Sequence, residues 1–309
     1  MLARVCAVML NTYREAVRAK VLHGLFALAL VTAGYCVVVG QFASAQAPRV
    51  LSDLGSASVA LYGAFVSIVL SATALHREIE LKTLFPILAR PIARWEYVLG
   101  KYLGTVLTLA VFVMGNTAVF LMALAATGNG SFWQPLAALA ASVALPALAA
   151  WRVPALRLLA PAIAAALLVV IGAWLAAHAP DDRRMLMVSA LLTICEVGIV
   201  SAIALLFSAF SSPFLTAVFT LGVFIVGRSA DTLAKLPERV FGETIHDLAV
   251  GLSRVVPNLM LYAPARALLT GEGIQSVSSY AGWAALHALG WAALLLCGAS
   301  LVFRRRDLT

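Results

Sequence analysis

The sequence predicts an all-α integral membrane protein: a polytopic bundle of six core transmembrane helices, an extra hairpin and an N-terminal amphipathic interfacial helix. Of its 309 residues, 62% are hydrophobic and only 12% are charged, whereas a soluble domain carries about 25% charged residues. The apolar residues gather in stretches of roughly 20, the length that crosses a hydrocarbon core. Lys and Arg collect between those stretches, as they do in loops that set membrane orientation. We therefore read the net charge of +8 as a topology signal, and expect no nucleic-acid partner.

Residues 1–22 predict the interfacial helix. Apolar residues recur there at helical spacing, and the opposite face is polar, with Arg4, Arg14 and Arg18 as its basic residues. Such a helix lies in the plane of the membrane interface, with its basic face toward lipid phosphates. Membrane lipids are therefore expected partners, and a simple membrane anchor is the alternative interpretation.

The transmembrane domain is predicted over residues 23–303. Its six core spans are residues 24–43, 55–75, 102–126, 185–210, 213–227 and 281–303, the fifth being short. Between the third and fourth spans, two apolar pieces, 135–150 and 158–177, predict an extra hairpin over 135–177. Pro146 and Pro154 predict a bend in its first piece. A re-entrant pair that does not fully cross is the alternative.

Charge orients these spans. The N-terminal segment, the loop 76–101 and the tail 304–309 are each net positive, and an even number of spans separates each from the next. The positive-inside rule then places both termini and this loop in the cytoplasm. The segment 228–280 becomes extracytoplasmic, either as an ordinary loop or as short helices. We expect a multi-pass protein of the cell inner (cytoplasmic) membrane.

The first span also resembles the apolar core of a signal peptide, because Ala43-Ser44-Ala45 follows it like a cleavage site. The charged region before the span is about 20 residues long, which is long for a signal peptide. We therefore expect an uncleaved first span.

The loop 76–101 is the most informative stretch. It is too apolar for a solvated linker and too charged to span, and residues 78–88 have helical character. Pro91 ends that helix, since proline lacks a donor and disfavours helix at the residue before it. Gly100 and Gly104 place small residues one turn apart, which suits close helix packing. From the residues alone, a docking element and an ordinary juxtamembrane loop fit equally well.

This loop resembles the signature of the ABC-2 type permease family, in which an acidic residue and a Thr precede a Leu-rich turn, then R-P-I-x-R and L-G-K-x-x-G. The matching positions are Glu78 or Glu80, Thr83, Leu84, Leu88, Arg90 to Arg94, Leu99 to Lys101, and Gly104. The likeness continues at residues 205–213, 222–229 and 255–259, and only the hairpin departs from the usual six spans. Within the family, the chain looks closest to the branch that includes the permease of nitrous oxide reductase maturation.

The resemblance implies a non-catalytic permease subunit that couples ATP hydrolysis by a separate ABC ATP-binding subunit to translocation, with export as the expected direction. A second permease copy, identical or a paralogue, would pair with it around a central route. ATP and Mg²⁺ are expected on the ATP-binding subunit, and no cofactor in this chain. In the family, the matching loop is a coupling helix that docks on the ATPase, beside a connecting helix that matches residues 2–20. The predicted docking residues are Glu78, Glu80, Lys82, Thr83, Leu84, Phe85, Arg90 and Arg94.

Signatures of other activities are missing from the sequence. It has no G-x-x-x-x-G-K-[ST] phosphate loop, no H-E-x-x-H and no G-x-S-x-G. The four cysteines are far apart, without the C-x-x-C spacing of a zinc or redox site. This agrees with a permease whose ATPase is another chain.

Glu196 is predicted well inside the span 185–210. An ionisable group at that depth is costly and is a functional candidate; a structural, hydrogen-bonded Glu is the alternative. If Glu196 relayed protons, the chain would be a proton-coupled secondary transporter. That function needs an ionisable partner, for which His287 in the last span is available. A non-transporting membrane scaffold is the third class of function.

Overall fold

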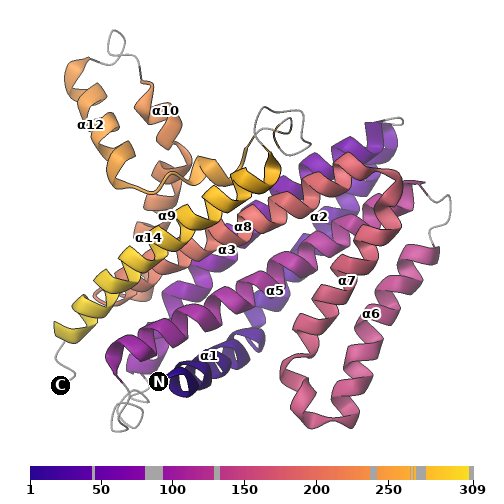
Figure 1. Ribbon diagram of the computed structural model, residues 1–309, viewed down its shortest axis with the longest axis horizontal. Coiled ribbons are helices and arrows are strands. Elements are labelled where there is room, and N and C mark those ends of the chain that lie inside the picture. The colour runs from indigo at the N-terminus through magenta and orange to yellow at the C-terminus, as the bar shows by residue number, and fades with distance from the viewer. Residues whose placement is uncertain are drawn as a thin grey trace.

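The computed structural model of the protein describes residues 1–43, 46–80, 93–128, 133–236, 242–264, 266, 268 and 276–305. Within these ranges, every regular element is an α- or 3-10 helix, as the sequence predicts. Figure 1 shows the long helices running side by side as one bundle. In chain order the elements are α1 (Leu2–Val17), α2 (Lys20–Phe42), α3 (Ala47–Glu80), α5 (Arg94–Gly128), α6 (Trp133–Arg152), η2 (Pro154–Leu158), α7 (Ala160–Leu175), η3 (Ala176–His178), α8 (Pro180–Ser208), α9 (Pro213–Arg228), α10 (Ala230–Ala234), α12 (Glu243–Val255), η4 (Leu259–Tyr262) and α14 (Val277–Arg305).

Seven helices in the described ranges are long and apolar enough to cross a membrane. They are α2, α3, α5, α6, α8, α14 and α7 with its extension η3. The predicted span 213–227 is different, because α9 has only 16 residues. At 1.5 Å per residue it covers about 24 Å, less than the roughly 30 Å of a hydrocarbon core. The chain therefore has both helices of the predicted hairpin, and one core helix that is too short to cross alone.

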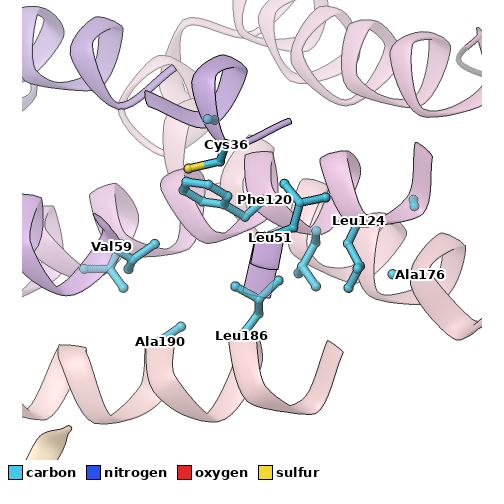
Figure 2. Close-up of a cluster of buried hydrophobic side chains, with 12 residues drawn as sticks. Cys36, Leu51, Val59, Phe120, Leu124, Ala176, Leu186 and Ala190 are labelled. Atoms are coloured by element: carbon cyan, nitrogen blue, oxygen red, sulfur yellow. The ribbon is translucent and has the colours of Figure 1, made fainter. Parts of the chain in front are cut away.

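The core forms around α5 and α8, the most buried of the long helices. A cluster of buried side chains from α2, α3, α5 and α8 fills the space between them, with Phe120 packed beside Cys36 (Figure 2). Gly55 of α3 allows this approach: a Cβ there would lie 2.8 Å from Cδ1 of Phe120. Lipid tails are as apolar as these side chains, so close packing at small residues holds such helices together.

The first helix of the hairpin is longer than its sequence predicts. The helix α6 runs through Pro146 to Arg152, so this proline does not end it, and Pro154 begins the connecting turn η2. The next helix, α7, packs closely on α5, since a Cβ at Gly172 would lie 3.0 Å from the Leu121 Cβ. Exposed Trp133 and Trp151 mark the two ends of α6, about 27 Å apart along the helix. Tryptophans at both interfaces are typical of a full crossing.

The segment after α9 folds as short helices instead of an ordinary loop. In Figure 1, α10 and α12 project together from the side of the bundle beyond the end of α9. The outer stripe of α12 is apolar and exposed, at Ile245, Leu248, Leu252 and Val255. This spacing is typical of a helix that lies in a membrane interface.

Both termini lie at one end of the bundle. Figure 1 shows the N-terminal end of α1, the C-terminal end of α14 and the start of α5 together there. Between the N-terminal helix and the start of α5 the chain runs through α2 and α3, and from there to its C-terminus it runs through five membrane-length helices and the short α9.

Candidate functional site

A buried ion pair joins α8 to the end of α9. The Nε and Nη2 atoms of Arg228 donate to the two carboxylate oxygens of Glu196 at 2.7 and 2.8 Å. The Glu196 side chain is 0% exposed and that of Arg228 is 25% exposed. Phe224, one turn earlier, places its ring 5.7 Å from the Arg228 guanidinium. A charge at this depth is stabilised only by a well-placed partner, and α9 supplies one by ending near the middle of α8.

His287, the partner that the sequence offered for Glu196, belongs to a different network. The indole Nε1 of Trp291 donates to His287 Nε2 at 3.1 Å. Since an indole is only a donor, Nε2 carries no proton, and the proton on Nδ1 is donated to Tyr262 Oη at 2.9 Å. The Tyr262 hydroxyl donates in turn to Ala284 O at 3.2 Å. Burial raises the pKa of the Tyr262 phenol, so it stays a neutral donor that ties η4 to α14.

A cavity of about 530 Å³ lies between α3, α8, α9 and η4, beside the ion pair of Glu196 and Arg228. Ligand pockets commonly measure about 300–1,000 Å³. The cavity lies toward the starts of α3 and α8, the end of the bundle away from the termini. Its lining consists of Ser56, Ala57, Ala60, Leu61, Met185, Ser189, Thr193, Phe224, Arg228, Tyr262, Ala263 and Pro264.

Arg266 joins the chain after η4 to the starts of two long helices. Its Nη1 atom donates to Ser52 Oγ at 3.0 Å and forms an ion pair with Asp53, and Nη2 bonds to Asp182. Ser52 Oγ also donates to Asp182 at 2.7 Å. The cluster therefore holds η4 against α3 and α8, over the cavity.

Of the predicted docking residues, Glu78, Glu80 and Arg94 are described, and they lie at the other end of the bundle. Lys82, Thr83, Leu84, Phe85 and Arg90 are outside the described residues. Glu78 and Glu80 occupy the last turn of α3. Arg94, the first residue of α5, donates from Nη1 to Phe303 O at 2.8 Å. This bond joins the start of α5 to the end of α14.

The predicted interfacial helix is α1, and it is packed on α5 along one stripe, formed by Val5, Thr12, Tyr13 and Ala16. The two small residues noted in the sequence permit the contact, because a Cβ at Gly104 would lie 2.6 Å from Met9 O and one at Gly100 2.7 Å from Val8 Cβ.

The three basic residues of the predicted interfacial helix lie outside that stripe. Arg14 and Arg18 are exposed, and Arg4 is half-exposed and 3.9 Å from Glu96. On the same side of the contact, Lys101 Nζ lies 3.7 Å from Glu15. Arg14 and Arg18 thus have exposed side chains, and Arg4 is paired with Glu96.

The described part of the chain holds no group of three His, Cys, Asp or Glu residues that could bind a metal ion. What sequence reasoning missed was Arg228, which it assigned to the extracytoplasmic segment. The one available signal was the short length of the span 213–227.

Comparison with protein families matches residues 6–308, nearly the whole chain, to the ABC-2 family transporter protein family. Comparison with curated proteins finds no match.

Proposed function

The chain belongs to the ABC-2 transporter family, and from that premise we propose that it couples ATP hydrolysis by a separate ATP-binding subunit to the export of a substrate. The observation that carries the proposal is the family match over residues 6–308, which includes all seven membrane-length helices. Members of this family are membrane subunits without catalytic activity of their own. The chain is thus a multi-pass permease of an ABC transporter, and the energy must come from a partner.

The helix α3 offers a direct mechanical route for that coupling. It is continuous from Ala47 to Glu80, about 51 Å at 1.5 Å per residue. Its last turn holds Glu78 and Glu80 of the proposed docking segment, and its first turns supply Ser56 and Ala60 to the cavity wall. Rigid helices transmit displacement between distant sites. A push at the docking end would therefore move the cavity wall.

The remaining parts of the proposal follow from the same family likeness. A second permease copy or a paralogue would complete the route, and ATP with Mg²⁺ would bind to the ATP-binding subunits. The termini and the docking end would face the cytoplasm from the inner membrane, and α1 would rest against lipid headgroups through Arg4, Arg14 and Arg18. The closer likeness to the permease of nitrous oxide reductase maturation stays a prediction.

Proton-coupled transport is the alternative function. It would need a relay from Glu196 to a second ionisable group, whereas both carboxylate oxygens of Glu196 are bonded to Arg228. Among the described residues, no hydrogen bond joins Glu196 to His287. A non-transporting membrane scaffold would bind no ATP-binding subunit, so co-purification distinguishes it from a permease.

Co-purification tests the coupling proposal. The chain is solubilised from cells that express it at native level, as wild type and with Glu80→Arg plus Arg90→Glu. The matched control reverses two charges on α12, Glu243→Arg plus Arg254→Glu. We expect an ATPase with Walker motifs to co-purify with wild type and control, and to be lost from the loop variant. Recovery of no ATPase with wild type would reject the coupling proposal and favour the scaffold.

Cysteine labelling tests the topology, including the hairpin. In a background without the four native cysteines, Arg152→Cys reports on the turn between α6 and α7, and Asp181→Cys on the start of α8. We expect a membrane-impermeant maleimide added to intact cells to label Cys at 181, and to label Cys at 152 only after permeabilisation. Equal labelling of both positions in intact cells would exclude a full crossing of the hairpin.

A further inference from the structure

We propose that the cavity between α3, α8, α9 and η4 binds a molecule that carries an anionic oxygen group on an apolar body, and that Arg228 is the anion contact. The inference rests on the proposed transport function, because it names the class of substrate that the route would carry. It depends on three features of the cavity: the free edge of a guanidinium, the position of the compensating charge, and the character of the walls.

The first feature is the unused donors of Arg228. A guanidinium has five N–H donors in a planar fork. One from Nε and one from Nη2 are donated to Glu196. Among the described residues, no hydrogen bond uses the remaining three. Because Glu196 takes the Nε side, the edge formed by Nη1 and Nη2 remains, and this fork matches a carboxylate or a phosphate.

The second feature is the burial of the compensating charge. Glu196 is fully buried behind Arg228, whose side chain is partly exposed and lines the cavity. The ion pair is neutral as a whole, but its positive end is the end that a ligand meets. Glu196 therefore acts as a positioning residue: it holds the guanidinium in one orientation and does not contact the ligand.

The third feature is the lining. Of the described residues that line the cavity, Arg228 is the only charged one. The other walls are largely apolar, and the residues with hydroxyl groups among them are Ser56, Ser189, Thr193 and Tyr262. Apolar walls with a few convergent polar groups are typical of ligand sites. A cationic ligand would meet Arg228 as a like charge, so the site discriminates against it.

A fluorescent fatty acid and its methyl ester test the inference. Parinaric acid and methyl parinarate have the same tail, and only the acid carries a charge. Each is titrated against the purified full chain in neutral phosphatidylcholine nanodiscs. We expect the wild type to bind the acid about tenfold more tightly or better, as charge-assisted hydrogen bonds imply. In Glu196→Gln plus Arg228→Gln, the two affinities should agree within about twofold. The control Arg152→Gln, an exposed arginine at the end of α6, should keep the preference.

Competition identifies the source of the anion. Displacement of bound acid by dodecyl phosphate alone indicates a free amphiphile, and displacement by phosphatidylglycerol as well includes lipid headgroups. Both results retain Arg228 as the contact. Equal displacement by uncharged dodecanol would overturn the inference.

A second variant keeps the test decisive if the double substitution prevents folding. Ala60→Phe leaves the ion pair intact and fills the cavity, so it should abolish binding of both probes. A preference for the acid that survives in Ala60→Phe, or equal affinities in wild type, would overturn the proposed site. Co-purification of the ATPase is measured on the same samples. A wild type that binds both probes equally and retains its ATPase rejects the site alone, whereas a preference for the acid without any ATPase rejects the coupling.

Discussion

Replacing Gly104 with alanine tests how tightly α1 is seated on α5. A Cβ at this position would lie 2.6 Å from the backbone oxygen of Met9 and 2.6 Å from the Cβ of Thr12. Neither atom moves when a side chain changes rotamer, so α1 itself must shift. Ordinary contact begins at 3.4 Å, which requires a displacement of about 0.8 Å from atoms in a packed interface.

A second glycine isolates the cost of that displacement. Gly290 of α14 has no described atom within 4 Å of an added Cβ. Both substitutions gain the helix propensity of alanine, about 1 kcal/mol relative to glycine, so this gain cancels between them. The difference is the strain of overpacking, about 1–3 kcal/mol. At roughly 2 °C for each kcal/mol, Gly104→Ala should unfold about 2–6 °C below Gly290→Ala.

The assay is thermal unfolding of the two purified variants and wild type in the same detergent, followed by intrinsic fluorescence and by loss of the monodisperse peak. We expect Gly290→Ala to unfold about 2 °C above wild type, and Gly104→Ala to unfold about 0–4 °C below it. If Gly104→Ala were as stable as Gly290→Ala, α1 would not be packed against α5 as described, and it would not link the interface to that helix.

Three further changes test other parts of the structure by the same comparison with wild type. Arg228→Ala leaves the buried Glu196 without its partner and should cost about 3–5 kcal/mol, whereas Glu196→Leu plus Arg228→Met should unfold near the wild-type temperature. Phe120→Ala removes a fully buried ring and should cost about 3 kcal/mol; an unchanged unfolding temperature would contradict the packing in Figure 2. Arg266→Gln should accelerate amide hydrogen exchange in η4 by about tenfold or more, since hydrogen bonds to charged groups contribute about 1.5–3 kcal/mol. The exposed control Arg254→Gln should leave that exchange unchanged. Equal acceleration in both variants would refute the role of Arg266 in holding η4 against α3 and α8.

The helices themselves were predictable because the bilayer imposes a strong local rule. A backbone in hydrocarbon must satisfy its hydrogen bonds internally, so long apolar stretches become helices. This rule located the cores of α2, α3, α5, α8 and α14. The glycine spacing at positions 100 and 104 also predicted a close helix contact correctly, although it could not identify α1 as the partner.

The candidate site was less predictable because it depends on where helices end. Glu196 was recognisable as an ionisable group at membrane depth, yet its partner was not. Arg228 follows an apolar run and precedes a charged segment, which is the usual pattern of a residue just outside the membrane. Hydropathy measures the length of a span and not its level beside other helices, so it could not identify Arg228 as the partner of Glu196. In the hairpin, α6 continues through Pro146 to Arg152, and the bend that the sequence predicts at this proline stays a prediction.

The sequence by itself determined that the chain is an α-helical membrane protein, and its motifs pointed to the right transporter family. Composition, span length and charge asymmetry act locally along the chain, so no knowledge of distant contacts was needed. Only the tertiary structure decided that Arg228 compensates Glu196, that Arg266 ties η4 to α3 and α8, and that a cavity lies between them. These contacts join residues far apart in the sequence, and interhelical packing, which no single stretch encodes, sets their distances.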